Sequence, residues 1–119
     1  MSEAMSEAIE TIGFEHFLGV EIRAGTIVEA SRNPKARAPA YVLRIDFAQY
    51  GVKTSSAQIT ANYTPEDLVG KQVVAVLNFE PKRIAGVKSE VLVLGAVSAD
   101  RGVVLLEPSF AVENGARVA

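Results

Sequence analysis

Residues 20–30 read Val-Glu-Ile-Arg-Ala-Gly-Thr-Ile-Val-Glu-Ala, and this stretch decides the fold class. Apolar or small side chains recur at every second position from Val20 to Thr26, which is the period of a strand with one face in a core. Gly25 interrupts the alternation, as expected at a β-bulge or at the bend of a barrel strand. The stretch therefore predicts a bent strand in an all-β domain.

The segments on either side of this strand predict more short strands and two short helices. Phe14, Phe17 and Leu18 share one helical face after the capping residue Thr11, and Gly19 is placed to end that helix. A second helix is expected to begin at the N-cap Thr64 with Pro65 in its first turn, and to stop at Gly70. Asp100-Arg101-Gly102 predicts a hairpin turn. The other strands are expected over 40–47, 52–59, 72–79, 90–97 and 103–106.

Five or six short strands with a helix between the third and fourth predict a small closed barrel, because closure protects strand edges. The simplest match is a five-stranded OB-fold barrel with short N- and C-terminal extensions, and other small barrels stay open at this point. Residues 1–13 are expected to form a flexible or helical extension. Residues 14–119 are expected to form the domain, including a C-terminal dimerisation segment.

The charge distribution differs from what the net charge of −2 suggests. Five of the 14 acids lie in residues 1–21, which hold no Lys or Arg, so the rest of the chain carries 12 bases and nine acids. Residues 32–44 contain four bases and residues 82–88 contain three, and neither stretch contains an acid. A basic body indicates a polyanion or an anionic peptide group as partner, and scattered solvated charge is the alternative.

Cellular location and membrane insertion are constrained by what the chain lacks. There is no cysteine, so disulfides and thiolate metal sites are excluded. No apolar run approaches the roughly 20 residues that span a bilayer, and the first residues lack the basic and apolar regions of a signal peptide. We therefore expect a cytoplasmic protein without membrane insertion.

The sequence shows no catalytic constellation. His16, the only histidine, lies in the acidic N-terminal helix, where a surface or packing role is expected. Ser55 and Ser56 have no second histidine to act as a base. No segment matches a phosphate loop or a dinucleotide fingerprint. We expect no enzyme activity, no metal and no cofactor.

A binding site is better supported, around residues 78–90. Lys82 and Arg83 offer donors to phosphate or carboxylate oxygens, while Asn78 and Ser89 supply neutral hydrogen bonds. An ordinary solvated hairpin loop is the alternative. An OB-fold would bring the polar strand 52–59 to the same mouth. The predicted ligand-binding residues are Lys35, Arg37, Lys53, Ser55, Ser56, Gln58, Asn78, Phe79, Lys82, Arg83, Ser89 and Glu90.

The motif Glu21-Ile22-Arg23-Ala24-Gly25-Thr26-Ile27-Val28 resembles the opening strand of the tRNA-binding domains found alone or appended to aminoacyl-tRNA synthetases. The stretches at 55–60, 70–79 and 89–96 are similar to CsaA, the small bacterial export-related chaperone branch of that family. The resemblance covers about residues 14–118. It implies an OB-fold homodimer that binds unfolded or exported polypeptides, with tRNA binding as the ancestral activity.

Two hypotheses about function follow from these observations. The first is a dimeric protein-export chaperone that binds unfolded or precursor polypeptides through the barrel surface. The second is a structure-specific tRNA-binding protein, although Val91-Leu92 stands where tRNA-binding relatives usually carry a methionine. A C2 partner is expected to cover the apolar face of the N-terminal helix. The predicted dimer interface is Phe14, Phe17, Leu18, Pro108 and Val112.

Overall fold

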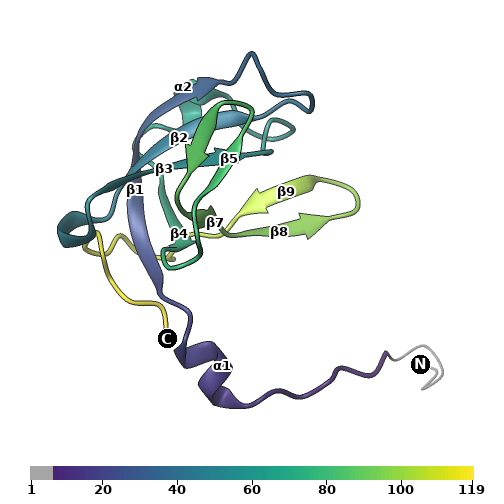
Figure 1. The fold of residues 1–119 in the computed structure, drawn as a ribbon, viewed down its shortest axis with the longest axis vertical. Coiled ribbons are helices and arrows are strands. Elements are labelled where there is room, and N and C mark those ends of the chain that lie inside the picture. The colour runs from purple at the N-terminus through teal and green to yellow at the C-terminus, as the bar shows by residue number, and fades with distance from the viewer. Residues whose placement is uncertain (1–6) are drawn as a thin grey trace.

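One long strand organises the fold of the computed structural model, which describes residues 7–119 (Figure 1). The first half of β1 (Ile22–Arg32) pairs with β4 (Gln72–Val76), and its second half pairs with β2 (Tyr41–Asp46). Thr26 lies at the junction, opposite Asp46 on one side and Gln72 on the other. Because one strand serves two neighbours in turn, the sheet curls into a nearly closed barrel.

The other elements are short. The five-stranded sheet has the order β3-β2-β1-β4-β7, and two hairpins, β5–β6 and β8–β9, stand apart from it. A short helix joins β3 to β4, so the predicted five-stranded OB-fold with its helix between the third and fourth strands is confirmed. The remaining elements are α1 (Phe14–Leu18), η2 (Ala48–Tyr50), β3 (Val52–Ala57), α2 (Pro65–Leu68), β5 (Lys82–Ile84), β6 (Val87–Ser89), β7 (Leu92–Val93), β8 (Gly95–Ser98) and β9 (Gly102–Leu105).

The barrel interior is aliphatic with two aromatic rings. Tyr41 and Phe47 are almost completely buried, and the Tyr41 hydroxyl donates a 2.6 Å hydrogen bond to the Tyr63 carbonyl. Burying one such side chain contributes about 1.5–3 kcal/mol, and this favourable term opposes the entropy cost of ordering short strands. Fully buried aliphatic side chains from β1, β2, α2 and β4 complete the core: Ile27, Leu43, Ile45, Leu68 and Val73.

Two features of β1 differ from the sequence prediction. The register shift lies between Ile27 and Glu29, so the bulge is not at Gly25. Gly25 is required for a different reason, because an added Cβ would lie 2.6 Å from the Phe47 ring and 2.8 Å from Ile45 Cγ2. The glycine therefore marks a close approach across the barrel core.

Two of the three predicted helix caps and turns are confirmed, and one is wrong. The Thr64 hydroxyl accepts a hydrogen bond from the Asp67 amide at 3.2 Å, so the predicted N-cap of α2 is confirmed. The predicted cap of α1 at Thr11 is wrong, since Gly13 occupies that position and no side chain caps the helix. The predicted turn after Asp100 is confirmed by the β8–β9 hairpin.

The apolar strand expected over 90–97 is two strands in the structure. β7 pairs with β4 in the barrel, whereas β8 leaves the barrel to pair with β9. Leu94 lies between them, with its amide donating to the Val74 carbonyl and its carbonyl accepting from the Leu106 amide. A continuous apolar run conceals this change of partner, because both strands need apolar residues.

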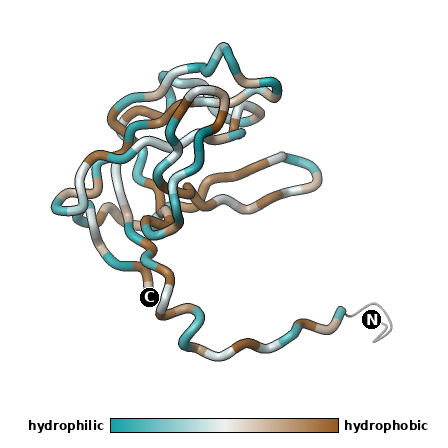
Figure 2. Tube along the Cα trace, viewed as in Figure 1, coloured by the Kyte–Doolittle hydropathy of each residue, from teal (hydrophilic) through white to brown (hydrophobic). Residues whose placement is uncertain are grey.

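The two chain ends behave differently. The C-terminal segment lies along the start of β1, where the Gly115 amide donates to the Ala24 carbonyl at 2.7 Å. The N-terminal segment projects from the barrel, and its described residues before α1 form neither helix nor strand (Figure 1). Hydrophobic residues occur both in this N-terminal arm and in the β8–β9 hairpin (Figure 2). Ile9, Ile12 and Phe14 are 90%, 75% and 69% exposed. Residues 1–6 of the predicted extension lie outside the described chain.

Candidate ligand-binding grooves

The predicted site segment contains a hairpin of its own. Strands β5 and β6 pair Lys82 with Ser89, Arg83 with Lys88 and Ile84 with Val87. Both turn residues have positive φ, 47° for Ala85 and 82° for Gly86, as in the two-residue turns that match strand twist. The sequence predicts only a connection here, because Ala-Gly is a weaker turn signal than Asn-Gly or Asp-Gly.

One side of this hairpin borders an apolar groove with a volume of about 350 Å³. Phe79, Ile84 and Leu92 contribute its apolar walls and are 52%, 40% and 50% exposed. Solvent-exposed apolar side chains around one concavity are the usual mark of a binding site. The apolar groove is lined by Ser56, Phe79, Glu80, Lys82, Ile84, Ser89, Glu90, Val91 and Leu92.

A seam of side-chain hydrogen bonds joins β3 to residues 89–91 beside the groove. The Ser89 hydroxyl accepts from the Ser56 amide at 3.0 Å, and Glu90 Oε1 accepts from the Thr54 amide at 3.1 Å. The Glu90 amide donates to the Thr54 carbonyl at 2.7 Å. Two side-chain oxygens thus occupy places where a neighbouring strand would offer carbonyl oxygens. These bonds close the barrel where the strand ladder does not.

The tip of the hairpin borders a basic groove of about 270 Å³, lined by Arg32, Asn33, Pro34, Lys35, Val42, Ala85, Gly86 and Val87. The lining includes two bases and no acid. Asn33 holds the long β1–β2 loop against the hairpin tip, since its Nδ2 donates to the Ala85 carbonyl at 3.4 Å. Arg83 and Lys88 face each other in the hairpin and do not line the groove, and no carboxylate in residues 7–119 lies within 4.0 Å of Lys35, Arg83 or Lys88.

The structure brings five of the predicted site residues together in the apolar groove: Ser56, Phe79, Lys82, Ser89 and Glu90. Of the other predicted residues, Lys35 lines the basic groove, Arg37 is exposed in the β1–β2 loop and Arg83 is exposed on β5. Lys53 lies near the start of β3, and Gln58 follows its end. Three groove residues, Ile84, Val91 and Leu92, are not predicted from the sequence, because an apolar side chain there indicates only a strand or a core.

Ser55 was predicted to face a ligand, and the structure corrects this prediction. Its side chain points into the barrel, is 1% exposed and donates a 3.0 Å hydrogen bond to the Val91 carbonyl. The reason is strand alternation: Ser55 pairs with the core residue Leu43, whereas Ser56 pairs with Val42 on the outer face. Only one of two adjacent serines can reach the groove.

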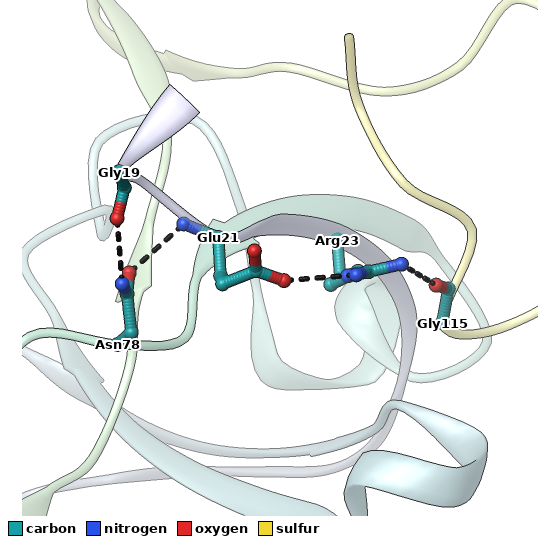
Figure 3. Close-up of polar contacts among 5 residues, drawn as sticks. All are labelled: Gly19, Glu21, Arg23, Asn78 and Gly115. Atoms are coloured by element: carbon teal, nitrogen blue, oxygen red, sulfur yellow. Dashed lines mark hydrogen bonds and ion pairs between the residues drawn. The ribbon is translucent and has the colours of Figure 1, made fainter. Parts of the chain in front are cut away.

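Asn78 holds two parts of the chain together (Figure 3). Its Nδ2 donates to the Gly19 carbonyl at 2.8 Å, and its Oδ1 accepts from the Glu21 amide at 2.9 Å. The amide group therefore fixes the exit of α1 from the barrel, next to the groove residue Phe79. A role as a direct ligand contact is not needed to explain this asparagine.

Arg23 connects the same region to the C-terminal segment (Figure 3). Its Nη2 bonds Glu21 Oε1 at 2.8 Å, and its Nη1 donates to the Gly115 carbonyl at 3.2 Å. The guanidinium also lies 4.7 Å from the centre of the Tyr50 ring, within the range of a cation–π contact. In the motif that resembles the family, Arg23 thus makes structural contacts within the chain.

The residues predicted for a dimer interface lie in two places. Phe14 and Phe17 stack in α1 with ring centres 6.0 Å apart, and Leu18 on the same helix is 53% exposed. Val112 is 39% exposed, while its backbone is held by the side chain of Gln72. Pro108 lines a separate shallow cavity beside the α2–β4 connection.

The side chains in residues 7–119 that could ligate a metal lie apart from one another. His16 is exposed in α1, and within this part of the chain no three His, Asp or Glu side chains gather as metal ligands would. No helix in the same residues is long and apolar enough to cross a membrane.

A curled five-stranded sheet with exposed grooves around a hairpin defines an OB-fold binding domain. Residues 22–117 match the family described as "Putative tRNA binding domain". The chain belongs to this tRNA-binding-domain family, as the sequence motif predicted.

The solved structures most similar in fold include two CsaA chaperones. The one from Bacillus anthracis str. Ames is 52% identical with a TM-score of 0.88, and the one from Picrophilus torridus is 47% identical with a TM-score of 0.86. In both comparisons 92% of this chain matches 100% of the other. These neighbours confirm the predicted resemblance to the CsaA branch.

Curated relatives are much longer proteins. The methionine–tRNA ligase of Porphyromonas gingivalis is 38% identical over 109 residues, which cover 92% of this chain and 16% of the ligase. The chain therefore spans about a sixth of the length of such relatives. The shared part corresponds to an accessory domain of the ligase. The similarity therefore does not assign the ligase activity to this chain.

Proposed function

We propose that the protein is a non-catalytic chaperone that binds unfolded polypeptides in the apolar groove. The main observation that supports this proposal is the group of exposed apolar side chains around one cavity beside the β5–β6 hairpin: Phe79, Ile84 and Leu92. Unfolded chains differ from folded ones chiefly in their exposed apolar side chains, which such a groove can bury. The CsaA neighbours, which are chaperones by name, support the same function.

The charges around the apolar groove favour a polypeptide over a polyanion. Its lining has one base, Lys82, and two acids, Glu80 and Glu90. A phosphate backbone would meet these carboxylates as like charges, whereas a polypeptide backbone is neutral. Each buried CH₂ group contributes about 0.8 kcal/mol, so a few aliphatic side chains are enough for micromolar affinity.

Fluorescence anisotropy with a labelled, reduced and carboxymethylated protein fragment tests the proposal. We expect micromolar binding that Leu92→Asp weakens at least tenfold, because the substitution places a charge in the apolar wall. Val97→Asp is the matched control, since Val97 is 86% exposed on β8 and does not line the groove. Absence of binding to every fragment tested would refute the proposal.

RNA is the second candidate ligand, and the unpaired bases of the basic groove and of the β5–β6 hairpin are the observation that favours it. Lys35, Arg83 and Lys88 have no carboxylate partner within 4.0 Å in residues 7–119, so their charge is available to phosphates. We expect tRNA affinity that falls steeply with salt, and a smaller slope of log affinity against log salt when Lys35 and Lys88 become Ala. An unchanged slope, or no tRNA binding at low salt, would refute this candidate.

We also propose a homodimer held partly by the N-terminal arm. Ile9, Ile12, Phe14 and Leu18 are more than half exposed on one chain, and a second copy is the simplest cover for them. Sedimentation should show a dimer at micromolar concentration, and Phe14→Glu should shift it toward the monomer. A monomer in the unmodified protein would contradict the proposal.

We also propose a role in protein export. A chaperone with this role would act in the cytoplasm, where it would bind precursor proteins before they are translocated. Peptide arrays should then show stronger binding to the N-terminal regions of secreted precursors than to their mature regions, and fractionation should recover the protein with cytoplasmic markers. Equal binding to both regions would leave a general chaperone.

A further inference from the structure

The edge of β3 that faces away from β2 is covered over only part of its length. β3 is at the end of the five-stranded sheet, and its only ladder partner is β2. On its other side it meets residues 89–91 through the seam of side-chain bonds already described. An uncovered edge presents a row of backbone donors and acceptors to any extended chain.

Alternation along β3 decides which backbone groups face this edge. Both backbone groups of Thr54 face it, because they bond the side chain and the amide of Glu90. The Ser56 amide faces the same way, toward the Ser89 hydroxyl. The amide and the carbonyl of Gln58, just beyond the end of β3, come next in the alternation, and neither has a hydrogen-bond partner in residues 7–119. One acceptor and one donor are therefore open where the seam ends.

The open groups lie two residues along the chain from Ser56, which belongs to the lining of the apolar groove. In an extended peptide, backbone groups point sideways and side chains point up and down in turn. A peptide lying along β3 can thus bond the open backbone groups and direct an alternate side chain between Phe79 and Leu92. These two interactions need no particular sequence beyond an apolar residue.

We propose that a polypeptide client binds as an added strand on the β3 edge at Ser56–Gln58, with an apolar side chain in the groove. The proposal rests on the polypeptide-binding function and adds how the client is held. The occupant is an extended, uncharged segment, since Glu80 and Glu90 in the lining disfavour a polyanion. Pairing through the backbone makes recognition tolerant of sequence, and the groove supplies the preference for apolar residues.

Backbone N-methylation of a peptide tests the strand. The probe is a fluorescein-labelled Gly-Ser-Thr-Val-Leu-Val-Thr-Ser-Gly peptide and a set of its variants, each with one methylated amide. Methylation removes a donor and leaves the side chain in place. We expect an affinity loss of about tenfold at the one amide that donates to the open carbonyl and less than twofold at the amides on either side of it, since one lost hydrogen bond corresponds to roughly that factor.

The possible results separate the binding mode from the function. A loss at one amide, with its two neighbours nearly unaffected, supports the added strand. Binding that is insensitive to methylation, or that is weakened equally at neighbouring amides, overturns the strand and leaves the apolar groove as the binding site. No binding of the unmodified peptide at any concentration up to about millimolar overturns the strand and, if protein fragments also fail, the proposed function.

Amide exchange gives an independent measurement on the protein. In the ¹⁵N-labelled protein, we expect the Gln58 amide to exchange at least tenfold more slowly with the peptide bound, because it gains a hydrogen bond. Gln49 in η2 is the matched control, since its amide also lacks a partner and its residue does not line the groove. Unchanged exchange at Gln58 with the peptide bound would overturn the proposal.

Discussion

The strand that carries the family motif and the hairpin that carries the candidate site use their polar groups in opposite ways. In β1, the Arg23 guanidinium contacts Glu21, Gly115 and Tyr50 within its own chain. In the β5–β6 hairpin, Arg83 lies opposite Lys88, and no carboxylate in residues 7–119 is within 4.0 Å of either. Like charges in facing positions destabilise a strand pair. The difference indicates that β1 is optimised for the fold, whereas the hairpin keeps its charges available.

The largest effect is expected inside β1, from Gly25→Ala. The new Cβ would lie 2.6 Å from the Phe47 ring, and overpacking of this kind costs about 1–3 kcal/mol. We expect the melting temperature to fall by about 4 °C for each kcal/mol lost. Gly19→Ala is the control, because its φ of −74° suits any residue and the added Cβ would lie no closer than 3.6 Å to another atom. A loss no greater than that of the control would mean that the contact with Phe47 is unimportant.

A smaller effect is expected where β1 and the site segment meet, from Asn78→Ala. This substitution removes two hydrogen bonds, to Gly19 and Glu21, and exposed bonds contribute about 1 kcal/mol each. Urea denaturation should show the loss, and proteolysis should cut more quickly near α1. Asn78→Asp keeps the acceptor for the Glu21 amide and should lose about half as much. If peptide affinity falls while stability is unchanged, Asn78 is a ligand residue and the structural interpretation is wrong.

Asn78 also shows what could be predicted from the sequence and what could not. The period of two in β1, the Thr64 cap and the turn near Asp100 are local signals, and the structure confirms the elements they predicted. Contacts between distant segments leave no local signal. The bond from Asn78 to Gly19, the burial of Ser55 and the partner change at Leu94 each depend on which segments the barrel brings together. The groove residues Ile84 and Leu92 were missed because an apolar residue in a strand predicts burial equally well.

On the hairpin side of the comparison, Phe79→Ala should change binding and leave stability nearly unaltered. The ring is 52% exposed at the groove, so its removal should alter the free energy of unfolding by less than about 0.5 kcal/mol. Peptide affinity should fall about fivefold in anisotropy titrations, because the groove loses apolar area. Phe47→Leu, a change inside the core, should show the reverse pattern. A stability loss in Phe79→Ala larger than its binding loss would contradict the division between the two regions.

The smallest effect, and the one that tests the hairpin's charge directly, is expected from Lys88→Glu. The substitution turns the facing pair Arg83–Lys88 into opposite charges, and such cross-strand changes amount to about 0.2–1 kcal/mol. We expect a small gain in stability that shrinks at high salt, together with weaker tRNA binding. Lys88→Met removes the repulsion without adding attraction, so it should recover part of the gain. If Lys88→Glu is more stable and binds tRNA as before, the unpaired bases serve no polyanion, and RNA loses its support as a ligand. If stability falls, repulsion between these two bases is not what distinguishes the hairpin from β1.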